Sequence, residues 1–155
     1  MDLSDRIVAM KAIVGDITHI AGLYNGKIDR KVKILPVETN CLPHLQLGAP
    51  GALAGSEWVP LVVALYEAFL EGRMDRAWSL QKVVLDQVPL SLPRVASQAM
   101  GGTIAHSGIG FIKEKFRLMS GIDLGPPIPP YEPASEQEKA KAKRDVEVIR
   151  RILQL

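Results

Sequence analysis

Lys11 is the residue whose type and position most directly suggest chemistry. It ends a short apolar run, Ile7 to Met10, and Gly15 and Asp16 follow it. An amine withdrawn from water at the end of a strand loses part of the stabilisation of its charged form, and a neutral amine can attack a carbonyl carbon to form a Schiff base. The alternative is a lysine that only keeps the strand end in water, and Lys11 alone does not decide between the two.

The elements around Lys11 alternate between strand and helix, which is typical of parallel sheets. The predicted strands are short and apolar on both sides, as buried parallel strands are, and they cover residues 6–10, 31–35 and 52–55. Asp16 can cap the first predicted helix. The helices expected in this part of the chain cover residues 17–25, 40–47, 60–72 and 75–87.

The C-terminal part of the chain is predicted to be helical in pieces. Residues 90–119 are predicted to form helical segments that are interrupted at Pro93 and at glycines, among them Gly108 and Gly110. Residues 125–133 must be extended, because each proline removes a donor and biases the residue before it away from helix. Ser135 caps a last helix that runs to Leu155, with Glu138 as its capping-box partner.

Composition excludes several classes of protein. The chain has 155 residues, 47% of them apolar and 23% charged, which is enough for one globular core. A net charge of +2 is too small to indicate a nucleic-acid partner. One cysteine cannot form a disulfide framework, and the first residues lack the regions of a signal peptide, so we expect a cytoplasmic protein. No apolar run approaches the roughly 18 residues of a membrane span.

The order and spacing of these features resemble the C-terminal half of the pyruvate-dependent class I aldolases related to dihydrodipicolinate synthase and N-acetylneuraminate lyase. Residues 7–11 with Gly15 and Asp16 are similar to the sixth barrel strand of that family, with Lys11 at the Schiff-base position. Residues 32–35 and 48–55 resemble its seventh and eighth strands, and residues 125–139 continue the resemblance.

The resemblance implies an α/β chain equivalent to the C-terminal portion of a (β/α)8 TIM barrel, with about three parallel strands and C-terminal helices. Residues 1–60 would hold the last three strand-helix units. Residues 61–155 would form a helical C-terminal layer of the same domain. The implied activity is that of a Schiff-base-forming lyase or aldolase, which breaks or makes a carbon–carbon bond of pyruvate or a related 2-keto acid without a cofactor.

The resemblance also suggests which residues lie near the substrate. Chemistry in barrels collects at the C-terminal ends of the strands, so Gly55 and Ser56 would lie near the keto acid. Glu38 stands where the family has a glycine-acid motif, and its carboxylate is a further substrate-binding candidate. Glu57 and Trp58 stand near the usual asparagine of the family, which indicates an altered pocket.

A complete barrel takes about 250 residues, and the family's essential tyrosine and its threonine-containing carboxylate loop come from strands that precede this stretch. We therefore expect a homo-oligomer, or a complex with a complementary N-terminal half-barrel chain, because open strand edges favour association. One alternative is a non-catalytic truncated family member or assembly subunit. Another is a binding module in which Lys11 only attracts a carboxylate.

The remaining candidates for chemistry are three histidines and one cysteine. His19, His44 and His106 have no metal-ligand spacing to one another or to Cys41, so no metal site is predicted. Cys41 is more typical of a small buried side chain than of a nucleophile.

Overall fold

The computed structural model describes residues 7–12, 22, 24, 32–87 and 108–154. The chain divides into two compact units, Met1–Val84 and Leu85–Leu155. The first unit contains strands β1 (Ala9–Ala12) and β2 (Lys33–Pro36), the short 3-10 helices η2 (Glu38–Asn40) and η3 (Ser56–Trp58), and helices α2 (Cys41–Gln46) and α3 (Val59–Leu70). Helix α4 (Met74–Gln87) begins in the first unit and ends in the second, which also contains α6 (Gly108–Ser120) and α7 (Glu136–Leu153).

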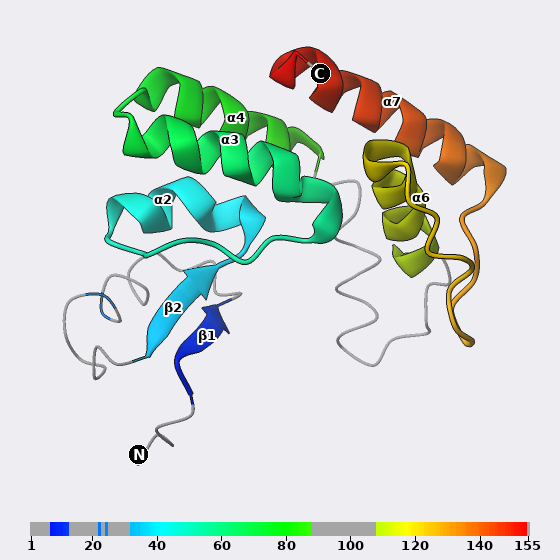
Figure 1. Ribbon diagram of the computed structural model, residues 1–155, viewed down its shortest axis with the longest axis horizontal. Coiled ribbons are helices and arrows are strands. Elements are labelled where there is room, and N and C mark those ends of the chain that lie inside the picture. The colour runs from blue at the N-terminus through cyan, green and yellow to red at the C-terminus, as the bar shows by residue number, and fades with distance from the viewer. Residues whose placement is uncertain (1–6, 13–21, 23, 25–31, 88–107, 155) are drawn as a thin grey trace. The chain divides into compact units, whose positions relative to one another are not determined.

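The two strands form a parallel sheet. Lys11 stands opposite Leu35 and Ala12 stands opposite Pro36, and both arrows point the same way in Figure 1. The pair must be joined by a long connection, because parallel neighbours cannot be linked by a tight turn. A parallel sheet with helices confirms the predicted α/β fold class.

The first strand is shifted from its predicted position. The apolar run predicted a strand over residues 6–10, whereas β1 covers Ala9–Ala12, so Lys11 lies inside the strand and not after it. Hydrogen bonding explains the shift. The N–H of Lys33 donates to the carbonyl of Val8 at 3.0 Å, so the ladder starts where β2 offers a partner, whatever the local hydropathy.

The predicted third strand at residues 52–55 is wrong as a regular strand. This segment is extended beside β2, and its one recorded ladder bond runs from the N–H of Leu53 to the carbonyl of Pro36 at 2.8 Å. That bond shows that the backbone of Pro36 faces residue 53. Proline has no N–H to donate on that side, so the ladder cannot continue as a regular parallel pair.

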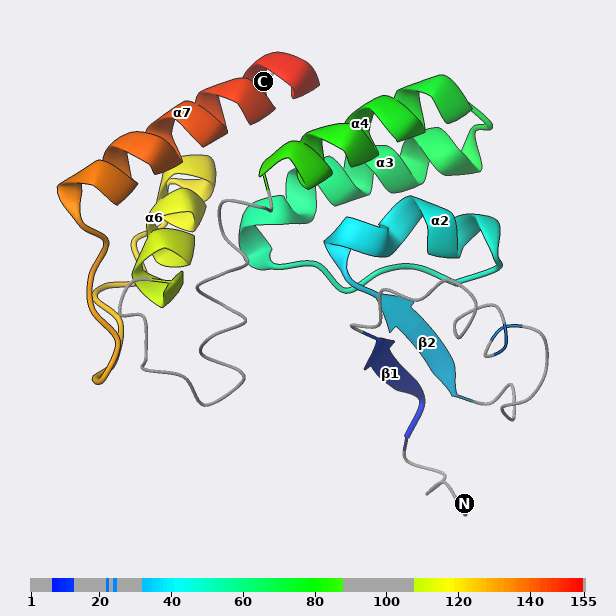
Figure 2. The same ribbon diagram turned by 180° about the vertical axis from the view of Figure 1, so that it is seen from behind.

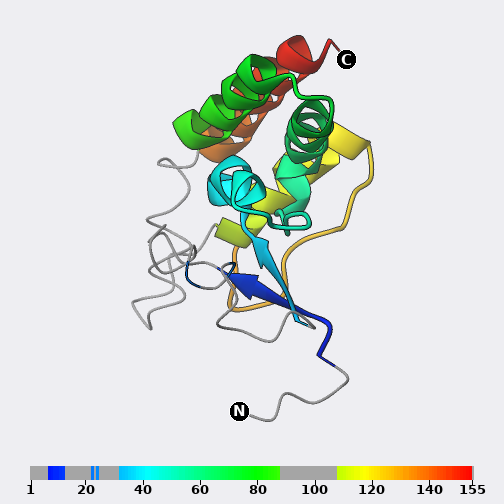
Figure 3. The same cartoon turned by 90° about the vertical axis from the view of Figure 1, so that its left-hand side faces the viewer.

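Helices cover the first unit beyond the strands. The short helix predicted at residues 40–47 is confirmed by α2, which lies directly beyond the tip of β2 in Figure 3. The two longer predicted helices are confirmed by α3 and α4, which lie side by side in Figures 1 and 2. The buried apolar side chains of these elements include Leu42, Leu45, Leu61, Val62, Leu65, Ala68, Ala77, Leu80 and Val84.

Gln81 joins α4 to the start of α2. Its side-chain oxygen accepts a hydrogen bond from the N–H of Leu42 at 2.9 Å. Its side-chain nitrogen donates to the carbonyls of Glu38 and Thr39, each at 3.1 Å. The first N–H groups of a helix have no partner within the helix, so a glutamine from another helix caps α2.

In the second unit, α6 packs against α7. The predicted cap of α7 is confirmed: the Ser135 side chain accepts from the N–H of Glu138, and the Glu138 carboxylate accepts from the N–H of Ser135 at 2.9 Å. Gly108 and Gly110 were predicted to break a helix but lie in the first turn of α6. A Cβ on Gly110 would lie 2.5 Å from the carbonyl oxygen of Glu132, so glycine is needed for close packing there.

A lysine pair binds the same carboxylate between α6 and α7. Lys115 on α6 is 1% exposed, and its Nζ lies 3.8 Å from Oδ2 of Asp145. Lys141 donates to the same oxygen at 2.6 Å, and its Nζ lies 5.0 Å from the centre of the Phe111 ring. Burying a charge costs much less free energy when an opposite charge lies beside it. We therefore interpret this lysine–aspartate cluster as a structural contact within the second unit.

Some predictions fall on residues that the structure does not describe. Most of the helix predicted at residues 17–25 and residues 88–107 lie outside the described ranges. The proposed division of the chain at residue 60 stays a prediction. Among the described residues, no helix is both long and apolar enough to cross a membrane.

Candidate functional site

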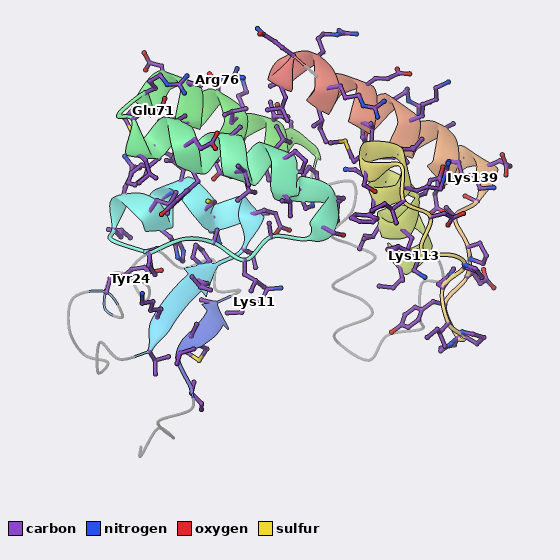
Figure 4. All side chains as sticks on the ribbon, in the orientation of Figure 1. Lys11, Tyr24, Glu71, Arg76, Lys113 and Lys139 are labelled. Atoms are coloured by element: carbon purple, nitrogen blue, oxygen red, sulfur yellow. The ribbon has the colours of Figure 1, made fainter. Side chains whose placement is uncertain are left out.

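Lys11 lies on the face of the sheet that is opposite the buried face. Side chains alternate between the two faces of a strand. Ala12, Ile34 and Pro36 are buried and share one face, whereas Lys11 and Leu35 share the other. The Lys11 side chain is exposed, so the expectation of an amine withdrawn from water is wrong for this chain by itself; Figure 4 shows Lys11 at the C-terminal end of β1. In a closed barrel with helices outside, the face away from the buried one lines the interior.

The extended segment after α2 continues this face. In the paired strands, Lys33 donates to Val8 and stands opposite Ala9. In this pairing, the donor stands opposite the residue that follows the acceptor. The hydrogen bond from the N–H of Leu53 to the carbonyl of Pro36 therefore places Leu53 opposite Val37, and Gly51, two residues earlier, opposite Leu35.

A contact supports this register. A Cβ built on Gly51 would lie 3.9 Å from Cδ2 of Leu35, as expected for directly opposite positions. Lys11, Leu35 and Gly51 therefore form one row across the sheet.

The structure brings together two of the other predicted site residues. The N–H of Gly55 donates to Oε2 of Glu38 at 3.3 Å. Ser56 follows directly as the exposed first residue of η3. Glu38, Gly55 and Ser56 thus lie past the C-terminal end of β2. Lys11 lies earlier along the sheet, in the row of Leu35, which comes three residues before Glu38.

Glu57 is a member of this region that the sequence marked only as a departure from the family pattern. Its side chain is 7% exposed. A Cβ on Gly55 would lie 2.7 Å from Oε2 of Glu57, so the carboxylate occupies the space that a side chain at position 55 would need. A glycine two residues before an acidic residue was the available signal, but it does not reveal that the side chain of the acid folds back toward the glycine.

Cys41 and His44 are core residues. Burial, together with the smaller effect of the nearby Glu38 carboxylate, raises the pKa of the Cys41 thiol to about 12. A thiol in that state carries almost no thiolate near neutral pH and is a poor nucleophile, as the sequence predicted. His44 is 1% exposed, and burial lowers its pKa.

The His44 ring is held by Tyr24, whose hydroxyl lies 3.2 Å from Nδ1 of His44. The same hydroxyl donates to the carbonyl of Ile34 at 3.2 Å. A hydroxyl has one proton to donate, so Nδ1 of His44 carries a proton and donates it to the Tyr24 oxygen. Within the described residues, no group of three or more His, Cys, Asp or Glu side chains is arranged to hold a metal ion.

Comparison with known proteins gives a fold and no sequence relative. Neither a protein-family model nor a curated protein matches the sequence. Solved structures do match. A Ruminococcus gnavus sialic acid aldolase, described as a catalytic lysine mutant, aligns with a TM-score of 0.71 and 15% identity over 91% of this chain and 44% of its own.

Two further structures have names from the dihydrodipicolinate synthase family. YagE, a prophage protein from Escherichia coli in complex with pyruvate, aligns with a TM-score of 0.67 and 20% identity over 96% of this chain and 47% of its own. The dihydrodipicolinate synthase from Oceanobacillus iheyensis aligns with a TM-score of 0.65 and 19% identity, covering 93% and 46% of the two chains.

The chain spans less than half the length of these structures. At such identities the likeness establishes the fold. The protein therefore has the fold of a part of the TIM barrel found in dihydrodipicolinate synthase and sialic acid aldolase structures.

Proposed function

We propose that this chain provides the Schiff-base lysine, Lys11, of a lyase or aldolase that acts on pyruvate or a related 2-keto acid. The observation that carries the proposal is the placement of Lys11 on the sheet face opposite the buried residues. The fold adds support, since one similar structure is a sialic acid aldolase with a catalytic lysine and another is a complex with pyruvate.

The chemistry assigned to Lys11 is imine formation. The neutral amine attacks the carbonyl carbon and forms a C–N bond, and the carbonyl oxygen leaves as water after taking up two protons. In the protonated imine, a base then removes the proton of a hydroxyl on C4, the bond between C3 and C4 breaks, C4 leaves as an aldehyde, and the bond electrons form the C2–C3 double bond of the enamine. The reverse sequence makes the bond. The protein must place a proton donor and acceptor beside the imine.

The chain provides one side of this site. Glu38, Gly55 and Ser56 lie beyond the end of β2, where a substrate on Lys11 would extend. The proton-transfer group and the donors for the keto-acid carboxylate would come from barrel strands outside this sequence. We therefore propose that Lys11 forms the imine in this chain itself, whereas cleavage of the carbon–carbon bond needs the barrel to be completed, by association of copies or by a complementary N-terminal half-barrel.

A second candidate is a non-catalytic assembly subunit. The observation in its favour is the exposure of apolar side chains on and before β1, where Ile7, Val8 and Met10 are 45%, 69% and 48% exposed. Such a surface favours association whether or not Lys11 reacts.

Trapping with borohydride distinguishes the two candidates. Hydride adds to an imine and makes a stable secondary amine, so incubation with pyruvate and borohydride followed by intact-mass and peptide analysis reports the reacting lysine. A Schiff-base enzyme gives one adduct, at Lys11. A subunit without chemistry gives no adduct, or labelling spread over many surface lysines.

A further inference from the structure

We propose that the substrate bound to Lys11 carries a hydrocarbon substituent beside its carbonyl, and that Leu35, Gly51 and Leu53 select it. This inference rests on the proposed function of Lys11 and names the substrate class: 2-oxo acids with an alkyl group, in preference to hydroxylated ones.

The first step of the argument is the row that crosses the sheet. Lys11 stands opposite Leu35, and the bond from Leu53 to Pro36 places Gly51 opposite Leu35 on the far side. Neighbouring strands lie about 4.8 Å apart. A small molecule held by the Lys11 amine above this face therefore lies against the Leu35 side chain.

Gly51 leaves space next to Leu35. Among the residues that the structure describes, the one atom within 4 Å of a Cβ at position 51 is Cδ2 of Leu35, at 3.9 Å. That separation is ordinary van der Waals contact, and no left-handed backbone conformation requires glycine here. Glycine at this position keeps a space open whose recorded neighbour is a hydrocarbon.

The next row along the strands is also apolar. Val37 has extended backbone angles, so its side chain stays on the face of Leu35, but it is buried and contributes to the floor of this row only from below the surface. Leu53 stands opposite it and is 44% exposed. Of these five positions on the face, Lys11 alone has a polar side chain. An alkyl group here gains apolar contact, whereas a hydroxyl loses hydrogen bonds to water that the side chains of Leu35, Val37 and Leu53 cannot replace.

The test compares three oxo acids on the same chain: pyruvate, 2-oxobutyrate and 3-hydroxypyruvate. The last two differ in a methyl against a hydroxyl, so their sizes are matched. Each is incubated with the protein and cyanoborohydride, and the rate of adduct formation at Lys11 is divided by the rate at Lys33, which is exposed on the same face. This ratio removes the intrinsic reactivity of each acid.

We expect the ratio for 2-oxobutyrate to exceed that for 3-hydroxypyruvate about tenfold, as one well-placed apolar group can discriminate. Gly51→Ala fills the space and should slow adduct formation with 2-oxobutyrate more than adduct formation with pyruvate. Leu53→Asn keeps the backbone bond to Pro36 and should raise the ratio for 3-hydroxypyruvate. An unchanged melting temperature shows that each variant folds.

The outcomes separate the two levels of the proposal. Adducts confined to Lys11 with equal ratios for 2-oxobutyrate and 3-hydroxypyruvate would overturn the substrate class and leave the Schiff-base function standing. If none of the three oxo acids forms an adduct faster at Lys11 than at Lys33, the proposed function is overturned, and the substrate class with it.

Discussion

Gln81 illustrates what a single buried polar side chain does in this protein. It lies on the apolar face of α4 and is fully buried. Its amide meets the N–H of Leu42 and the carbonyls of Glu38 and Thr39. The sequence could not predict this, because the partners are about forty residues away and no local pattern connects them. Lys11, by contrast, was singled out from the residues next to it in the sequence. Its position within β1 depends on the hydrogen-bond pairing of β1 with β2, which the sequence does not show.

Replacing Gln81 with Met should destabilise the first unit. Methionine fills a similar volume but leaves one buried donor and two acceptors without this partner, which costs about 1–3 kcal/mol for each group that water cannot reach. Urea unfolding followed by circular dichroism measures the loss. Gln46→Met is the matched control, because Gln46 is exposed at the end of α2, and it should change stability by less than about 0.5 kcal/mol. Equal effects of the two variants would contradict the capping role.

His44 should make stability depend on pH below neutrality. Burial lowers its pKa in the folded state, whereas in the unfolded chain a histidine takes up its proton near pH 6.5. Between these two pKa values the unfolded state binds more protons, so stability falls as the pH drops through 6.5 and is fully present above it. Urea midpoints at pH 8 and pH 5.5 should therefore differ more for the wild type than for His44→Gln. Parallel pH profiles of the two proteins would refute this assignment.

At the scale of elements, the signals that succeeded were local ones. Ser135 and Glu138 predict the start of α7 because the capping box involves residues three apart. The third strand failed because Pro36 removes a donor from the edge that residue 53 meets, which requires knowledge of the register. The prediction that Gly108 and Gly110 break a helix was wrong for a similar reason. The sequence alone does not distinguish a glycine that permits close packing from a glycine that breaks a helix.

Gly110→Ala should destabilise the packing of α6 against the segment before α7. The added methyl would lie 2.5–2.8 Å from backbone atoms of Glu132, Pro133 and Ala134, and backbone cannot move aside as a side chain can. Overpacking of this kind costs about 1–3 kcal/mol. Thermal melts measure the effect. Gly51→Ala is the control, since its methyl meets an ordinary contact of 3.9 Å. A Gly110→Ala protein that melts like this control would show that the contact can relax.

At the scale of the whole molecule, the chain has the fold of part of a barrel and less than half the length of the structures it matches. A barrel removes strand edges by closing, and a part of one leaves them open. The exposure of Val8, Met10 and Leu53 is what we expect of an apolar surface that packs against another part of a barrel or another chain. The resemblance noted in the sequence led to the same expectation, because the other barrel strands of that family precede the stretch that this chain resembles.

The isolated chain should therefore associate. Light scattering of the purified protein at micromolar concentration should give the mass of a dimer or larger assembly, because burial of the apolar residues on and before β1 favours contact. Met10→Lys, which places a charge on that surface, should shift the population toward monomer. A stable wild-type monomer would contradict the proposal that copies of this chain cover that surface.

The most direct test of the central claim is borohydride trapping with pyruvate on three proteins: the wild type, Lys11→Ala and Lys33→Ala. Lys33 is the matched control, because it is an exposed lysine on the same face of the same sheet. The Schiff-base function predicts one adduct that persists in Lys33→Ala and is lost in Lys11→Ala, with both variants melting like the wild type. An adduct that survives in Lys11→Ala, or no adduct in any of the three, would contradict it.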